Sequence, residues 1–534
     1  MKKWYVLLFL LPAVALIAIG SACAEGAKAF RDTLVIAATA IPVTLDPELG
    51  GSLESWEAPM NWGEALTDWH IKTNPNGTRE VDTTKPPVCL VCESFSLSPD
   101  GMKWTFKLKR EVKSFFGNEL TSEDVKWSFE RVPALQGVGT FIMKISGVDL
   151  KNPVTIIDKY TFEVNLMEPN PLLARALALP IPSSAVIHDT NEVKKHTTAS
   201  NPWAKEWLAT HTAGFGPFHV QSITPGQEVI WLANPHYHTN PPRIKKVIYK
   251  QVPDPATRAA LLQRGEVDIA TELTPRLREQ LRNKPGVVID SVAGNEAVIF
   301  GLNNNFPPLD NVKVRQAIAY ATPVDDIIKT VFLNQPGVRI APGYAPDYYP
   351  GALDRWPYQH HVEKAKSLLQ EAGVRPFSFK LAFNSARPTH EEIAILIKSA
   401  FKDLGIEMVL DKLSPAKYQE QYFTRKADAV LVQDSAWLPD GPYAIGLYFH
   451  STRGIADWIN YHNPRVNELL DKGSSSLDFA VRAQLAKEAH EIVVNEAPWG
   501  FYLHTGYHIT RRENVKGFVW RTHNLLQFYY FFKD

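Results

Sequence analysis

Two aspartates flank a tryptophan near the C-terminal end of this 534-residue chain. The segment DSAWLPDGPY contains Asp434, Trp437, Asp440 and Tyr443. A carboxylate pairs with an ammonium or guanidinium group, and an indole face attracts rings and cations. The available chemistry is therefore binding of a cationic or aromatic ligand. Simpler alternatives are a turn carboxylate at Asp440, which lies between a proline and a glycine, and a core position for Trp437.

Expected strands position these groups. An apolar strand at Ala429–Gln433 would end at Asp434 and place its carboxylate at a sheet edge. Asn384 and Arg387 follow a second expected strand, Phe379–Phe383. Arg387 could bind a carboxylate through two hydrogen bonds, although a surface arginine is the simpler alternative.

Enzyme signatures are absent from the sequence. The chain contains no G-x-S-x-G, H-E-x-x-H or G-x-x-x-x-G-K-[ST] motif. His390-Glu391 and His490-Glu491 lack the second histidine of a zinc-protease helix. We therefore expect a binding protein without catalytic residues, metal or cofactor, and ATP hydrolysis would belong to a partner.

The only cysteines beyond Cys23 are Cys89 and Cys92. No second Cys/His pair with ligand spacing follows, which argues against zinc, and Pro86-Pro87 precede the motif instead of a redox-type strand and helix. A small local disulfide and two buried thiols both remain open.

The first residues resemble an export signal. Two lysines precede the uncharged run Trp4–Ala24, so we expect residues 1–24 to be a cleaved signal peptide, with an uncleaved membrane anchor as the alternative. Two cleavage sites overlap there. One would leave Glu25 first, and the other, a lipobox-like sequence, would leave Cys23 as a lipidated N-terminus. We expect a periplasmic or extracytoplasmic protein whose only membrane contact is a lipid anchor, if one is present.

Charge and size narrow the class further. The 57 basic and 57 acidic residues balance, and signal cleavage would remove two lysines and no acid, which leaves a net charge of −2. That balance gives no argument for a nucleic-acid partner. A mature chain of about 510 residues exceeds what one core usually serves, so we expect two or three lobes.

The sequence of Glu93–Val132 predicts a turn, a strand and a helix in that order. A Ser-Pro-Asp-Gly turn precedes a strand in which Trp104, Phe106 and Leu108 alternate with polar residues. Thr121 then forms a capping-box start for a helix. This block resembles the signature of family 5 extracellular solute-binding proteins, the dipeptide-, oligopeptide- and nickel-binding components of ABC importers.

Other segments resemble the same family from about residue 32 to residue 528. They include a Pro-x-x-Leu-Asp-Pro loop, a Gly-Phe-Gly-Pro-Phe turn, the helix Arg258–Arg264 with the strand after it, and the helices Val312–Ala321 and Phe479–Glu496.

The resemblance implies an α/β fold with two lobes, a class II-like periplasmic binding protein with two crossover strands as its hinge. The first lobe would comprise residues 30–297 and 506–534, with an extra subdomain at about 75–210, and the second lobe residues 298–505. The function implied is capture of a peptide or peptide-like solute by hinge closure, followed by delivery to an ABC permease and its ATPase. We expect a monomer.

The resemblance also suggests site residues. Peptide-binding members carry an aspartate for the peptide ammonium where this chain has Trp437, so Asp434 or Asp440 would have to replace it. Further candidate ligand contacts are Trp62, Glu64, Asn303, Asn384, Arg387, Tyr443 and His504. The alternatives are a non-peptide solute (a metal chelate, opine, sugar conjugate or aromatic compound) and, from another class, an exported hydrolase.

Overall fold

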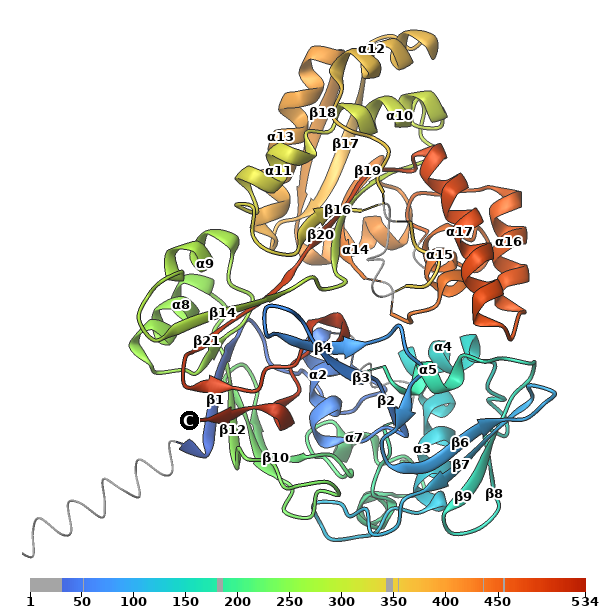
Figure 1. Ribbon diagram of the computed structural model, residues 1–534, viewed down its shortest axis with the longest axis vertical. Coiled ribbons are helices and arrows are strands. Elements are labelled where there is room, and N and C mark those ends of the chain that lie inside the picture. Colours follow the sequence, from blue (N-terminus) through green and yellow to red (C-terminus); the bar gives the residue numbers. More distant parts are fainter. Residues whose placement is uncertain are drawn as a thin grey trace, which may run out of the picture.

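The computed structural model describes residues 31–50, 52–179, 186–341, 349–353, 355–435, 437–454 and 457–534. The expected signal peptide, including Cys23, lies outside these ranges. A seven-stranded sheet and a six-stranded sheet organise the two lobes, which are stacked along the long axis of the molecule (Figure 1). The predicted two-lobed α/β fold is confirmed.

The first lobe is built on the seven-stranded sheet. Its strands, in spatial order, are β10 (Phe218–Thr224), β11 (Glu228–Ala233), β12 (Lys246–Gln251), β1 (Thr33–Ala38), β13 (Ile269–Ala270), β21 (Tyr507–Arg512) and β14 (Val287–Val292). Strand β1 is parallel to both neighbours, β12 and β13, and its Leu34 and Ile36 are fully buried. The helices of this lobe include α2 (Leu53–Trp62), α8 (Pro255–Arg264) and α9 (Pro275–Leu281).

A four-stranded antiparallel sheet forms a separate layer of the first lobe. Its order is β6 (Cys92–Leu97), β7 (Lys103–Leu108), β9 (Thr161–Asn165) and β8 (Val154–Ile156). The predicted alternation in β7 is confirmed, because Trp104, Phe106 and Leu108 are buried. The helices that follow in this region are α3 (Ser122–Leu135), α4 (Val138–Ile145), α5 (Leu173–Leu177), α6 (Thr190–Val193) and α7 (Lys205–Leu208). Thr121 and Asp124 form the predicted capping box of α3.

The second lobe is built on the six-stranded sheet. Its order is β16 (Val338–Ile340), β20 (Trp499–Thr505), β15 (Ala297–Leu302), β19 (Ala429–Asp434), β17 (Phe377–Asn384) and β18 (Ile406–Leu413). Its helices are α10 (Val312–Ala321), α11 (Val324–Thr330), α12 (Val362–Glu371), α13 (Pro388–Phe401), α14 (Pro415–Phe423), α15 (Gly441–Phe449), α16 (Pro464–Ser474) and α17 (Phe479–Glu496). The predicted bounds of α10 and α17 are confirmed.

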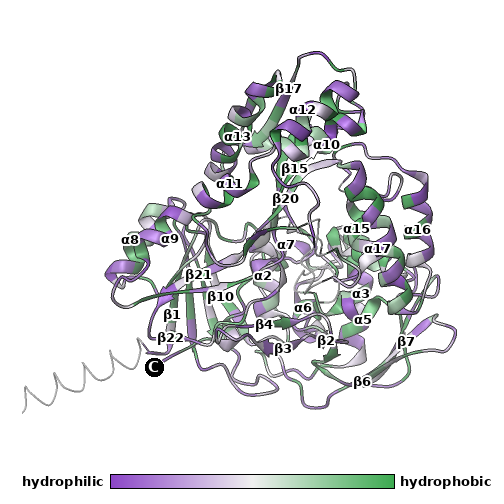
Figure 2. Cartoon of the chain, turned by 45° about the horizontal axis from the view of Figure 1, so that its top comes forward, coloured by the Kyte–Doolittle hydropathy of each residue, from purple (hydrophilic) through white to green (hydrophobic). Residues whose placement is uncertain are grey.

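Helix amphipathicity explains how these layers pack. In Figure 2, α13 and α16 alternate between hydrophilic and hydrophobic segments, and the buried residues of α16 include Val466, Leu469 and Leu470. Helix α15 differs because eight of its nine residues are buried, so it lies inside the lobe. No helix among the described residues is long and apolar enough to cross a membrane.

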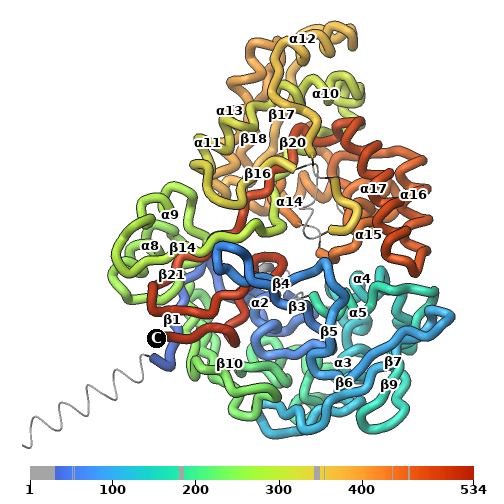
Figure 3. Tube along the Cα trace, viewed as in Figure 1, coloured from blue at the N-terminus to red at the C-terminus, as the bar shows by residue number. Residues whose placement is uncertain are grey.

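The chain crosses between the two large sheets twice. Strand β14 belongs to the first sheet and β15 to the second, while β20 and β21 make the return crossing (Figures 1 and 3). Gly506 is the single residue between β20 and β21, and its φ of +65° is a conformation that other residues adopt only with strain. The first crossing, between Val292 of β14 and Ala297 of β15, is also only a few residues long, so both crossings are short.

Candidate functional site

The strand order of the second lobe contains a topological switch point. Strands β17 and β19 are parallel neighbours. The chain leaves β17 through α13 toward β18 on one side, and leaves β19 through α15 toward β20 on the other. In open α/β sheets, ligands bind at the carboxyl ends of strands where connections diverge in this way. Asn384, Arg387 and Asp434 occupy these ends, so the sequence prediction places three candidates at one location.

Asp434 is a half-buried carboxylate at the last position of β19. Its Oδ1 accepts a hydrogen bond of 2.8 Å from the backbone N–H of Ser435, and Tyr448 provides a side-chain hydrogen bond. Burial raises the pKa of Asp434 to about 7, against the lowering effect of these hydrogen bonds. Among the described residues, no lysine, arginine or histidine forms an ion pair with it. The site therefore holds an acid whose charge a cation from outside could stabilise.

Sheet register places His504 near Asp434. Ala297 of β15 lies opposite Asp434 on one side and opposite His504 on the other. Directly paired residues point to the same sheet face, so these two side chains share a face, two strand spacings or about 10 Å apart. His504 is fully buried, and its ring centroid lies 5.2 Å from that of Tyr502.

Trp437 reaches the first lobe. Its ring centroid lies 5.8 Å from that of Trp56 in α2 and 6.1 Å from that of Phe141 in α4, with interplanar angles of 74° and 88°. All three side chains are half-buried. Trp437 thus belongs to the face between the lobes, and the alternative of a core position within one lobe is not supported.

The charge of Arg387 acts on the crossover residue Glu296. Burial raises the pKa of Glu296, and the charge of Arg387 partly offsets this rise. Glu296 also receives a hydrogen bond of 3.3 Å from Asn524 of the first lobe. Asn384 is half-buried and accepts from the backbone N–H of Ala386, which fixes the turn into α13. Arg387 is the cation of this group.

Tyr443 is almost completely buried in α15. Its pKa is raised well above the usual value, chiefly by burial and also by the charge of Asp434. Its hydroxyl has no hydrogen-bond partner among the described residues. A buried phenol without a partner is costly, so this hydroxyl is a candidate ligand contact.

Asp440 has a structural role instead of the predicted ligand contact. Its two carboxylate oxygens accept hydrogen bonds of 2.7 and 2.8 Å from Arg482, and Oδ1 also caps α15 at the N–H of Tyr443. The pair is fully buried. Because both oxygens are already used, the turn-carboxylate interpretation is the one that the structure supports.

Three further predicted contacts are also built into the fold. Asn303 binds the carbonyls of Arg425 and Ala427 and accepts from Asn460, so it holds loops together. The Trp62 ring packs on Gly214, where a Cβ would lie 2.8 Å from the indole. Glu64 pairs with His238 at 3.1 Å inside the first lobe. All three side chains are buried, and Asn303 and Glu64 are already bonded within the fold, whereas the indole N–H of Trp62 has no hydrogen-bond partner among the described residues. Sequence alone could not show this.

Cys89 and Cys92 are joined by a disulfide with a Cα–Cα distance of 5.0 Å. The bond connects β5 (Val88–Cys89) to the start of β6, and β5 pairs with β2 (Thr67–Asp68). Strand β6 is an edge strand of the four-stranded sheet in the first lobe. The disulfide is therefore a local constraint on that layer.

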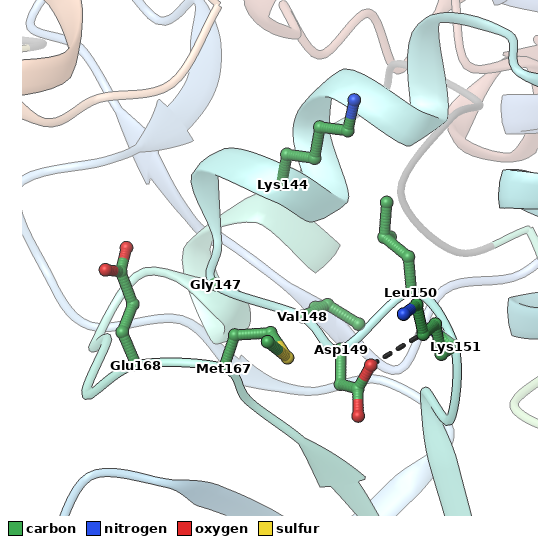
Figure 4. Close-up of a pocket in the computed structure, with 8 residues that line it drawn as sticks. All are labelled: Lys144, Gly147, Val148, Asp149, Leu150, Lys151, Met167 and Glu168. Carbon is green, nitrogen blue, oxygen red and sulfur yellow. Dashed lines mark hydrogen bonds between the residues drawn. The ribbon is translucent and has the colours of Figure 1, made fainter.

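A surface pocket lies elsewhere, beside α4 (Figure 4). It is lined by Lys144, Gly147, Val148, Asp149, Leu150, Lys151, Met167 and Glu168. None of the predicted site residues belongs to it, and its polar groups point in different directions in Figure 4. We therefore do not assign the ligand site to this pocket. Within the described ranges, no cluster of three His, Cys, Asp or Glu residues could hold a metal.

On the first-lobe side of the site, the sequence pointed to Trp62 and Glu64 and not to Trp56 and Phe141. Trp56 and Phe141 are ordinary aromatic positions of amphipathic helices, and nothing in their local sequence distinguishes them from core residues. Glu296 is recognisable only as an acid directly before a buried strand.

Two α/β lobes joined by two short crossings, with an acid at the strand ends that has no ion-pair partner in the described part of the chain, fit the class of solute-binding proteins. The sequence model of the bacterial extracellular solute-binding proteins, family 5 (middle part), matches residues 87–455. The chain belongs to this family, which is made of binding proteins.

Individual relatives span nearly the whole chain. The probable D,D-dipeptide-binding periplasmic protein DdpA of Escherichia coli is 28% identical over 496 residues, 92% of each chain. Heme-binding protein A of Haemophilus influenzae is 26% identical and covers 87% of this chain and 88% of its own. Among solved structures, the periplasmic binding protein DppA of Helicobacter pylori in complex with the peptide STSA has a TM-score of 0.77 at 23% identity, covering 94% of this chain and 98% of its own.

Proposed function

We propose that this protein captures a small peptide or peptide-like solute whose protonated amine binds Asp434, and that it delivers this solute to an ABC permease driven by a separate ATPase subunit. The observation that carries the proposal is the half-buried carboxylate of Asp434 at the switch point, with no cation of its own among the described residues. A ligand ammonium would supply the missing charge, since an opposite charge nearby favours the ionised carboxylate.

Closure of the lobes is the mechanism that the fold supports. We assign residues 30–297 and 506–534 to the first lobe, with an inserted subdomain at about 75–210, and residues 298–505 to the second. Contacts between α9 and the second lobe lie beside the crossings: Arg276 pairs with Glu392 at 2.9 Å, and Arg278 binds Gln335 through two hydrogen bonds. The lobes would rotate about these two crossings.

The relatives support both the leading ligand class and its alternative. The E. coli relative is named for D,D-dipeptides, which carry one ammonium and one carboxylate. Arg387 at the end of β17 could bind such a carboxylate. The Haemophilus relative is named for heme, so a non-peptide solute is the second candidate.

The place of action follows from the N-terminal sequence. We propose export to the periplasm or cell surface after cleavage within residues 20–25, with Cys23 as the candidate lipidation site. A mass measurement on the mature protein separates the two cleavage sites, since a lipid on Cys23 adds a large defined mass.

Calorimetry against a library of L- and D-dipeptides, combined with small-angle scattering, tests the proposal. We expect bound peptide to raise the melting temperature and to reduce the radius of gyration. Asp434→Ala should weaken binding, whereas Asp403→Ala, at an exposed position in the 3-10 helix Lys402–Leu404, should not. If the wild type binds no peptide, the peptide assignment is wrong, and binding without compaction would contradict closure.

A further inference from the structure

Three aromatic side chains from three elements meet between the lobes. They are Trp56 of α2, Phe141 of α4 and Trp437 of the segment after β19, and we refer to them as the aromatic trio. Each is half-buried, although the trio packs against residues of both lobes. In Figure 1, α4 lies directly below α15, on the side of the first lobe that faces the second.

The trio has the geometry of an incomplete aromatic cluster. Trp437 contacts both partners edge to face, with interplanar angles of 74° and 88°. Edge-to-face packing uses an edge of one ring and a face of the other. Because all three rings also remain partly exposed, each leaves ring surface on which a further group could pack.

The trio is also within reach of Asp434. Trp437 follows Asp434 by three residues, so their Cα atoms are at most about 11 Å apart. In a peptide, the terminal ammonium and the first side chain are attached to the same carbon atom. A ligand whose amine binds Asp434 would therefore present its first side chain close to Trp437.

We propose that the aromatic trio is a subsite for an aromatic side chain on the ligand residue that carries the amine. The inference rests on the proposed function for the position of that amine. It assigns Trp437 a role in ligand specificity. The competing outcome is that the trio only closes the lobes, in which case its loss would weaken all ligands equally.

Calorimetry with two matched dipeptides, Phe-Gly (as the L and the D form) and Gly-Gly, distinguishes these outcomes. The wild type should bind one form of Phe-Gly at least about tenfold more tightly than Gly-Gly, because an aromatic group fills the subsite. Trp437→Ala should abolish this preference and change Gly-Gly affinity by less than about threefold. Trp437→Phe should restore most of it.

The control is Trp207→Ala. Trp207 is a half-buried tryptophan in α7, and its ring centroid lies 4.1 Å from that of His196 and 4.9 Å from that of His211. Its substitution by alanine should leave both dipeptide affinities unchanged. Equal weakening of both dipeptides by Trp437→Ala, or a wild type without preference, would overturn the subsite while leaving peptide binding intact.

A second pair of probes separates this inference from the proposed function. If the wild type binds no peptide of the library, phenethylamine and ethylamine are compared by the same method. Preference for phenethylamine that is lost in Trp437→Ala would support the subsite and refute the peptide assignment. Absence of any preference would overturn the subsite as well.

Discussion

Three buried aspartates in the lobe interiors differ from Asp434, which lies between the lobes. Inside the lobes, three aspartates are paired with arginines through two hydrogen bonds each: Asp46 with Arg131, Asp68 with Arg521, and Asp440 with Arg482. Between the lobes, Asp434 has no such partner among the described residues, and burial raises the pKa of both Asp434 and Glu296. Arginines neutralise these three interior aspartates, whereas Asp434 has no cation among the described residues and Glu296 has only the partial compensation of Arg387. Other interior acids, Glu48 and Glu57, are not paired in this way, and burial raises the pKa of each to about 8.

Electrostatics explains why this difference indicates a binding site. An ionised carboxylate loses hydration when it is buried, and only a close opposite charge with hydrogen bonds compensates for that loss. Asp434 can reduce the cost by taking up a proton near neutral pH. A ligand ammonium would instead compensate the charge of the ionised carboxylate, and this ion pair would contribute to the binding free energy. Substitutions in an interior pair and at Asp434 test the two halves of this comparison separately.

The largest expected effect is on the interior pairs. Arg482→Met would leave Asp440 buried without its cation, and breaking such a pair costs about 3–5 kcal/mol of unfolding free energy. Urea unfolding of the ligand-free protein measures this loss. The double variant Asp440→Asn/Arg482→Met keeps the helix-cap acceptor and should recover part of the stability. A single variant within about 1 kcal/mol of the wild type would contradict the role of the pair.

The second effect concerns pH and the interlobe acid. A carboxyl group with a raised pKa in the folded state stabilises the fold at low pH, and this contribution is lost as pH rises from about 4 through about 7. Asparagine does not titrate. The stability of Asp434→Asn relative to the wild type should therefore increase between pH 5.5 and 8.5.

Using the difference between the two proteins removes the contributions of other titrating groups, including Glu57, whose pKa burial raises to about 8. Thermal or urea unfolding of both proteins at several pH values measures this difference in unfolding free energy. A difference that does not change with pH would show that Asp434 is already ionised at pH 5.5.

The smallest effect is expected at the exposed ion pair between the lobes. Both side chains of Arg276 and Glu392 are exposed, and such pairs contribute little because water screens them. Arg276→Ala should change ligand affinity by less than about fivefold in calorimetry. A larger loss would mean that surface charge, and not the interlobe acid and aromatic groups, controls closure.

Local signals predicted much of the fold. The capping box at Thr121, the alternation in β7 and the bounds of α10 and α17 follow from residues that are neighbours in sequence. Helix α8 begins at Pro255, three residues before the predicted start, since proline is favoured in the first turn.

The site was less predictable because it depends on distant partners. Asp434 and Asp440 are six residues apart and chemically identical, yet only Asp440 meets an arginine, 42 residues later in the chain. The proline and glycine beside Asp440 favoured a turn carboxylate there, but the sequence did not identify Arg482 as its partner. Trp56 and Phe141 likewise become site candidates only when the lobes bring them to Trp437.

Calorimetric titration of a dipeptide into the wild type and Asp434→Asn, at pH 6 and pH 8 and in two buffers of different ionisation enthalpy, tests the central claim most directly. The wild type should bind more tightly at pH 8, where Asp434 is already ionised, and should release protons on binding at pH 6, because the ligand cation then replaces the proton of Asp434. Asp434→Asn should bind at least about tenfold more weakly at pH 8 and release no protons from this site. Equal affinity and equal proton release in the two proteins would contradict the claim.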